Sequence, residues 1–205
     1  MAKENQKNQK RVYLYRHPPK ESGESKNVIG LSMPLSKKGQ EVARNLAKQL
    51  LAENDKPQMI VTSPCVRTYQ AGMIFAEVCD VSLPSIEPGL LGHYQEWERL
   101  ISLAPEKPTV LDFYKVDPGF MRREAESVLR VLQMLTHGLK LGESVVCFGH
   151  GGLIEPTIVL AQARICGKSF ADLAKTFPKD LKEGEAVVFV FDDDNNLVTV
   201  KRQNE

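Results

Sequence analysis

The chain has 205 residues, of which 42% are hydrophobic and 26% charged, and its formal net charge is +1. This length and composition are typical of a globular protein that buries one sizeable core. A net charge near zero gives no general attraction to polyanions, so we expect no nucleic-acid partner and no membrane partner. An anionic substrate would therefore need a local cluster of cations.

The N-terminus and the cysteines indicate the domain limits and the location of the protein. Residues 1–10 contain almost nothing apolar and are predicted to form a disordered polar tail, followed by a single domain over residues 11–205. The lysine-rich start lacks the apolar run of a signal peptide, and no segment reaches the roughly 20 apolar residues of a membrane helix. Four scattered cysteines without C-x-x-C spacing indicate reduced thiols, so a cytoplasmic location is expected.

Short strands alternate with helices along the chain. The expected strands are β-branched or aromatic runs at residues 11–16, 59–61, 82–86, 145–148, 186–191 and 197–200. The expected helices begin at Ser36, at Ser63 (as N-cap, with Pro64 in the first turn), at Pro118 and after Gly152. Residues 87–117 give no clear pattern and are expected to form a cover of short helices or loops. This alternation predicts a three-layer α/β/α fold with a mostly parallel central sheet.

Three short segments that follow strands carry the side chains of interest. Arg16 and His17 close the first strand, Arg67 lies in the first turn of the helix after the second, and His150 follows a buried strand. A neutral imidazole is a good nucleophile toward phosphorus, and guanidinium groups bind phosphoryl oxygens. The carboxyl ends of parallel strands form one edge of a sheet, where open α/β folds bind ligands. Each segment alone also fits an ordinary surface turn or cap, but the three together indicate a phosphoryl site.

These segments resemble the motifs of the histidine phosphatase, or phosphoglycerate-mutase-like, superfamily, in its mutase and small-phosphatase branch. Arg16-His17 is similar to its R-H motif, residues 34–40 (PLSKKGQ) to P-L-[ST]-x-x-G, residues 63–70 (SPCVRTYQ) to S-P-x-x-R-x-x-Q, and His150-Gly151 to the second histidine with its glycine. The resemblance implies a phosphoglycerate-mutase-like fold. It also implies that His17 is phosphorylated during the reaction and that Arg16, Arg67 and His150 bind the phosphoryl group.

The sequence departs from the family pattern at two places. Most members have glycine after the nucleophilic histidine, whereas Pro18 and Pro19 stand here, which stiffens the loop and removes backbone N–H donors. Lys20 is close enough in sequence to supply a replacement charge to the phosphoryl group.

The second departure concerns the proton donor. The resemblance leads us to expect a glutamate at the position of Gly92, which has no side chain to donate. His93 is the nearest substitute, Glu96 and Glu98 are alternatives, and His93 as an ordinary surface residue is an equal interpretation.

The sequence therefore predicts a phosphatase that hydrolyses a phosphomonoester through a phosphohistidine on His17, acting on a phosphorylated small molecule or a phosphoprotein. Two alternatives remain open: a phosphohistidine protein phosphatase, and a non-catalytic member that binds a phosphorylated ligand. We expect no cofactor and no metal, because no cluster of Asp, Glu, His or Cys has ligand spacing and residues 192–194 (DDD) fit a solvated turn.

Overall fold

The centre of the molecule is a six-stranded sheet in the order β3-β2-β4-β1-β5-β6. The computed structural model describes residues 8–21, 31–106, 108–177 and 181–203. Its strands are β1 (Lys10–Arg16), β2 (Met59–Thr62), β3 (Ser85–Ile86), β4 (Ser144–Gly149), β5 (Ala186–Phe191) and β6 (Leu197–Arg202). The pairs β1–β4, β4–β2 and β2–β3 are parallel, whereas β1–β5 and β5–β6 are antiparallel. The sheet is mostly parallel, as predicted.

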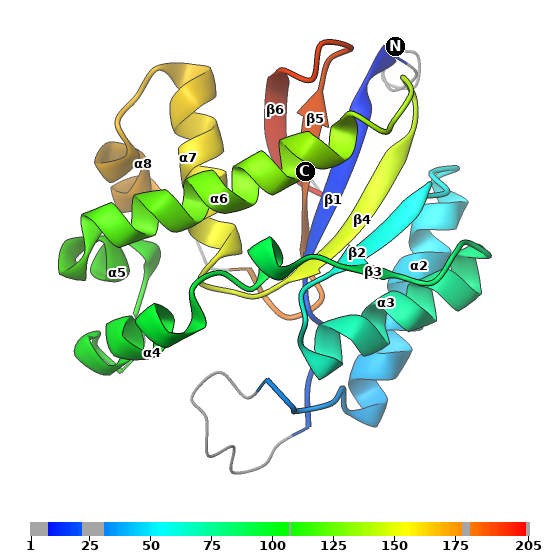
Figure 1. Cartoon of the computed structure of the whole chain (residues 1–205), viewed down its shortest axis with the longest axis horizontal. Coiled ribbons are helices and arrows are strands. Elements are labelled where there is room, and N and C mark those ends of the chain that lie inside the picture. Colours follow the sequence, from blue (N-terminus) through cyan, green and yellow to red (C-terminus); the bar gives the residue numbers. More distant parts are fainter. Residues whose placement is uncertain (1–7, 22–30, 107, 178–180, 204–205) are drawn as a thin grey trace.

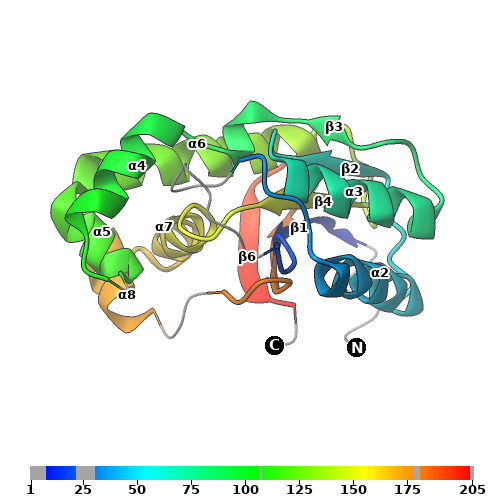
Figure 2. The same ribbon diagram turned by 90° about the horizontal axis from the view of Figure 1, so that it is seen from below.

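Helices cover both faces of this sheet (Figures 1 and 2). The helical elements are α2 (Lys37–Ala52), α3 (Val66–Cys79), the 3₁₀ turn η2 (Pro88–Leu90), α4 (Tyr94–Leu103), α5 (Val110–Val116), α6 (Pro118–Thr136), α7 (Ile154–Cys166) and α8 (Phe170–Thr176). Helices α2 and α3 lie on one side of the sheet, and α4 to α8 lie on the other (Figure 2). The predicted three-layer α/β/α architecture is confirmed, and the segment that had no clear pattern forms η2, α4 and α5. No described helix combines the length and apolarity needed to cross a bilayer.

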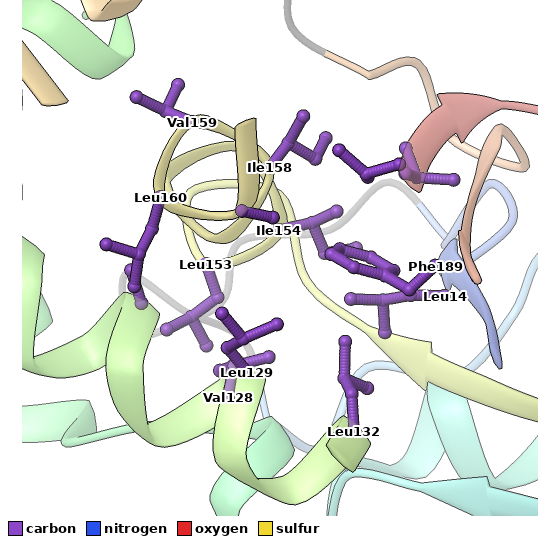
Figure 3. Packing of buried hydrophobic residues seen from close by; sticks show 14 of the residues in the cluster. Leu14, Val128, Leu129, Leu132, Leu153, Ile154, Ile158, Val159, Leu160 and Phe189 are labelled. Carbon is purple, nitrogen blue, oxygen red and sulfur yellow. The ribbon is translucent and has the colours of Figure 1, made fainter. Parts of the chain in front are cut away.

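Two buried clusters hold the layers together, because successive residues of a strand point to opposite faces. Leu14 and Phe189 belong to the larger cluster, with residues of α6 and α7. Figure 3 shows α6 and α7 side by side, with Leu132 of α6 and Ile154 of α7 both toward Leu14 and Phe189 of the sheet. Tyr15 and Phe148 point to the other face and pack with Phe75 of α3. Apolar burial on both faces fixes the strand register, and with it the position of each residue at the strand ends.

A polar cluster lies at the amino-terminal edge of the parallel strands. Asp55 is buried and accepts hydrogen bonds from Arg11 Nε (2.8 Å), Tyr13 Oη (2.6 Å) and Ser144 Oγ (2.5 Å). Two donors come from the first half of β1 and one from the first residue of β4, so the carboxylate ties together two strands and the segment that precedes β2.

The structure corrects two local predictions. Strand β1 begins at Lys10, inside the expected tail, because Lys10 Nζ donates to Asp193 O (3.0 Å) and Asn195 Oδ1 (2.8 Å) in the β5–β6 turn. The rest of the expected tail, residues 1–7, lies outside the described residues. Helix α3 begins at Val66 rather than at Ser63–Pro64, and its N-cap, Cys65, makes no side-chain cap bond. Ser63 was expected to cap this helix, but its hydroxyl bonds to residues of the site below.

Candidate active site

A pocket of about 220 Å³ opens at the carboxyl ends of β1 and β4. It is lined by Arg16, His17, Lys20, Arg67, Leu91, Trp97, Ile101, His150, Gly151 and Leu153. Strand β1 supplies Arg16 and is followed by His17, β4 is followed by His150, and the first turn of α3 supplies Arg67. All five side chains expected at the phosphoryl group, Lys20 included, therefore come together at one place.

His17 is held in one tautomer. Its ring is buried, and Nδ1 lies 2.9 Å from the carbonyl oxygen of Pro18. Because a carbonyl only accepts, Nδ1 carries the ring proton and Nε2 keeps the lone pair. Burial, with a further contribution from the positive charge of Arg67, lowers the pKa of His17 to about 3. His17 is thus neutral at physiological pH, which is the state that a nucleophile requires.

His150 lies beside His17, with ring centroids 5.4 Å apart, and both of its nitrogens are engaged. Arg67 Nη2 lies 3.0 Å from Nδ1, and Ser63 Oγ lies 2.7 Å from Nε2. A guanidinium only donates, so Nδ1 accepts and Nε2 donates to Ser63. The chain of hydroxyls continues to Thr68 Oγ1 at 2.9 Å. Burial, and then the charge of Arg67, hold the pKa of His150 well below its usual value, so this ring is neutral too.

The Arg16 side chain lies over the glycine that follows His150. Its Nη1 donates to Leu181 O, while its Nε is buried and makes no hydrogen bond to the residues that the structure describes. A Cβ on Gly151 would come within 2.7 Å of Arg16 Cζ and 2.8 Å of Nε. A side chain at position 151 would therefore displace this guanidinium, which explains why glycine stands there.

The loop after His17 is fixed by the segment that resembles P-L-[ST]-x-x-G. Pro19 O accepts from the backbone N–H and the hydroxyl of Ser36, the predicted N-cap of α2, both at 3.1 Å. A Cβ on Gly39 would lie 1.9 Å from Pro19 O, so only glycine lets α2 approach this closely. Gln70 Oε1 accepts from Leu35 N at 2.8 Å and ties α3 to the same loop. These motif residues position the loop that carries His17.

The space of the missing glutamate is filled from another helix. Gly92 has φ +70, and its Cβ would lie 2.2 Å from Oε2 of Glu124, a buried residue of α6. That carboxylate accepts from His93 N (2.9 Å), His93 Nδ1 (2.5 Å) and Trp97 Nε1 (3.1 Å). Its hydrogen bond and negative charge raise the pKa of His93. The His93 side chain is 68% exposed and does not line the pocket.

The other two candidate acids also lie outside the pocket. Glu96 Oε2 is 3.7 Å from Arg123 Nη2, and Glu98 accepts from Tyr94 Oη at 2.7 Å. The first contact joins α4 to α6, the second lies within α4 and is partly buried, and neither glutamate lines the pocket. Over the described ranges, no three His, Cys, Asp or Glu residues are grouped so that they could hold a metal ion.

Comparison with known proteins agrees with the geometry. The family model of the histidine phosphatase superfamily (branch 1) matches residues 12–183. The chain belongs to this superfamily. The resemblance drawn from the motifs is thus confirmed, and the match spans every strand but the last two. No curated protein sequence matches the chain closely enough to count as a relative.

Solved structures share the histidine phosphatase fold with this chain. Protein histidine phosphatase SixA, solved with tungstate, is 16% identical, with a TM-score of 0.61 over 93% of this chain and 94% of that one. Mycobacterial glucosyl-3-phosphoglycerate phosphatase is 16% identical, with a TM-score of 0.61 over 94% and 96%. YhfR of Bacillus stearothermophilus is 18% identical, with a TM-score of 0.60 over 96% and 97%. At these identities the likeness establishes the fold alone.

Proposed function

We propose that this member of the superfamily is a metal-independent phosphatase that hydrolyses a phosphomonoester through a phosphoryl group on His17. The observation that carries the proposal is the state of His17: a neutral imidazole whose Nδ1–H is bound to Pro18 O, in a pocket lined by Arg16, Arg67 and Lys20. A fixed lone pair beside three cationic groups suits attack on a phosphoryl dianion.

The reaction has two balanced steps. In the first, Nε2 of His17 forms a bond to phosphorus as the ester P–O bond breaks, and the leaving oxygen takes a proton. In the second, water attacks phosphorus, the P–N bond breaks, and the proton of the water returns to the group that gave one before. His17 is regenerated as a neutral imidazole, and inorganic phosphate leaves.

The cationic side chains would hold the phosphoryl oxygens. Because Pro18 and Pro19 have no N–H, the loop offers no donors at these positions, and side chains have to supply them. Arg16 is suited to this role, since its buried Nε makes no bond to the described protein. Once a phosphoryl oxygen binds Arg67, Nδ1 of His150 loses its donor; Nδ1 can then take the proton of a phosphomonoester monoanion and donate it in a hydrogen bond to the phosphoryl oxygen, while Nε2–H continues to donate to Ser63.

We propose His93, paired with Glu124, as the source of the proton. Leu91 lines the pocket but the ring of His93 does not, so the proton would pass to the leaving oxygen through a bridging water. The pair keeps His93 protonated at higher pH than a free imidazole, and Glu124 fixes the backbone and ring of His93. A donor matters in proportion to how poor the leaving group is. His93→Ala should therefore slow an alkyl phosphate about tenfold or more and a nitrophenyl phosphate much less. Equal slowing of both substrates would assign His93 to structure, and no change would leave Glu96, Glu98 or water as donor.

The direct test is turnover of 4-nitrophenyl phosphate by wild type, His17→Ala and His137→Ala. His137 is an exposed histidine at the end of α6, so it is a matched control. We expect His17→Ala to lose at least about 10³-fold in kcat, and His137→Ala to match wild type. Near wild-type turnover by His17→Ala would refute the proposal. Binding of vanadate without any turnover by wild type would instead indicate a non-catalytic phospho-ligand binder.

A phosphoprotein is the second candidate substrate, because one of the similar structures is that of a protein histidine phosphatase. A cytoplasmic setting is part of the proposal and is supported by four cysteines that are all free, three of them buried.

A further inference from the structure

A second pocket adjoins the first. Its volume is about 200 Å³, and it is lined by Arg16, Trp97, Ile101, Pro108, Val110, Phe113, Gly151, Gly152 and Glu155. It shares Arg16, Trp97, Ile101 and Gly151 with the pocket that contains His17. The site is therefore longer than a phosphate needs, and its extension is covered by α4 and α5, on the side of the sheet where α6 and α7 pack (Figure 2).

The lining of the two pockets becomes less cationic and more apolar with distance from His17. Lys20 and Arg67 line only the pocket that holds His17, and Arg16 lies where the two pockets meet. Leu91, Leu153, Trp97 and Ile101 form the apolar part of the first pocket. In the second pocket, Pro108, Val110 and Phe113 continue the apolar surface.

Trp97 is the fixed platform between the two pockets. Its indole Nε1 donates to Glu124, and its ring packs edge-on against Phe113 (centroids 5.6 Å apart) and Phe120 (5.2 Å). With the N–H engaged, the apolar part of the ring is what remains to line the cleft.

Polar leaving groups would find few partners here. Among the described residues, no Ser, Thr, Asn, Gln or Tyr side chain lines either pocket. The one carboxylate, Glu155, already accepts from Gly152 N (2.6 Å) and Leu181 N (3.1 Å). A sugar or glycerate leaving group would have to shed water from several hydroxyl groups and would find only Glu155 and Arg16 as side-chain partners in the extension, which is unfavourable.

We propose that the substrate of this phosphatase is a small phosphomonoester with an apolar leaving group, which lies along Trp97 and Ile101 and extends into the second pocket. The inference rests on the proposed function, because it names the substrate class of that same site. It favours such an ester over a phosphoprotein or a sugar phosphate, since the extension is small, is covered by two helices and, apart from Arg16 and Glu155, is lined by apolar side chains and glycines.

The test is a series of straight-chain alkyl phosphates from butyl to octyl, each below its micelle-forming concentration. Their alcohols have nearly equal pKa values, so chemistry stays constant while apolar contact grows. Each methylene that becomes fully buried should raise kcat/KM by about fourfold, and we expect an increase of at least about tenfold over the series. Glycerol phosphate and a phosphohistidine peptide should be poorer substrates than octyl phosphate.

Two variants locate the effect, and one serves as control. Ile101 is half-buried and lines both pockets, so Ile101→Gln should flatten the chain-length dependence while leaving inhibition by vanadate within about twofold. Val110→Thr adds a hydroxyl at nearly constant shape and should reduce the gain for octyl phosphate in particular, which covers the case that Ile101→Gln folds poorly. Leu103→Gln makes a matched change on the exposed side of α4, where Leu103 is 59% exposed, and should leave the series unchanged.

The outcomes separate this inference from the proposed function. Turnover with no chain-length dependence, or with a preference for glycerol phosphate or the peptide, overturns the inference and leaves the phosphatase assignment intact. Absence of turnover with every ester refutes the phosphatase. In that case, the affinity of non-hydrolysable alkylphosphonates, measured by calorimetry, still tests the inferred ligand class. Affinity that rises with chain length supports a phosphorylated ligand with an apolar group, and equal affinities overturn this inference.

Discussion

The substitution Gly151→Ala tests the site through a single methyl group. Gly151 has no left-handed backbone angle, so alanine itself causes no backbone strain there. The added Cβ would lie 2.7 Å from Cζ, 2.8 Å from Nε and 2.9 Å from Nη1 of Arg16. Carbon contacts in proteins are about 3.5–4.0 Å, so the guanidinium of Arg16 must move roughly 1 Å away from the new methyl group. This movement breaks its hydrogen bond to Leu181 O.

The expected effect is large on activity and small on stability. Removing one preorganised donor to a transition-state oxyanion costs about 10²–10³ in kcat. Because Gly151→Ala displaces Arg16 without deleting it, we expect kcat/KM to fall about 10- to 100-fold. Loss of the hydrogen bond to Leu181 O should reduce the free energy of unfolding by only about 1 kcal/mol.

The assay is hydrolysis of 4-nitrophenyl phosphate, together with inhibition by vanadate, in a double-mutant cycle with Arg16→Ala. If the methyl group acts through Arg16, Gly151→Ala should cost less than about threefold in the Arg16→Ala background. Gly138→Ala is the control, since its added Cβ meets no atom closer than 4.0 Å. Activity of Gly151→Ala within twofold of wild type, or full additivity in the cycle, would refute a role for Arg16 at the phosphoryl group.

Three further predictions concern metal, pH and the far edge of the sheet. Dialysis against a chelator should leave kcat unchanged, because the proposed chemistry uses only imidazole and cationic side chains; loss restored by a divalent cation would contradict it. Folding lowers the pKa of His17 from 6.5 to about 3. Below about pH 6.5, His17 is therefore protonated in the unfolded chain but stays neutral in the folded protein. Its contribution to the free energy of unfolding falls as the pH drops from 6.5 toward 3. His17→Gln should therefore show a shallower loss in urea titrations between pH 6.5 and 4.5, and an equal slope in both proteins would count against a neutral buried imidazole. Asp55→Ala leaves Arg11 without its buried carboxylate and should lower the free energy of unfolding by about 3–5 kcal/mol, with kcat of the folded protein unchanged because this cluster lies at the opposite edge; a loss of kcat would indicate coupling between the edges.

The sequence predicted most of the architecture because its strands can be recognised from short stretches of sequence. Strands β4 and β5 are continuous apolar runs, and the middle of β1 (residues 12–15, VYLY) is β-branched and aromatic, as expected of strands buried on both faces. Parallel pairing then brings Arg16, His17 and His150 to one edge without further information. The predicted tail wrongly included Lys10, the first residue of β1. Lys10 is polar, and the partners of its side chain lie 183 and 185 residues away, so local sequence gave no sign of the strand there.

Two contacts of the site could not be predicted from local pattern. Ser63 has the sequence context of an N-cap, but its hydroxyl bonds to His150, 87 residues further on, and the helix starts later. Glu124 lies on the apolar face of α6, 31 residues from His93. A lone glutamate among Met121, Ala125 and other core-facing residues was the available signal, since a carboxylate is rarely buried without partners. In each case the partner is set by packing between elements.

The central claim is that the phosphoryl group passes through His17, and a rapid-quench experiment tests it most directly. Wild type mixed with a ³²P-labelled aryl phosphate should, within a single turnover, carry label that is stable in alkali, is lost in acid and maps to the peptide containing His17. The labelled protein should form and decay at least as fast as kcat, and His17→Ala should carry none. Label on any other residue, or full turnover without labelled protein at any quench time, would contradict the account.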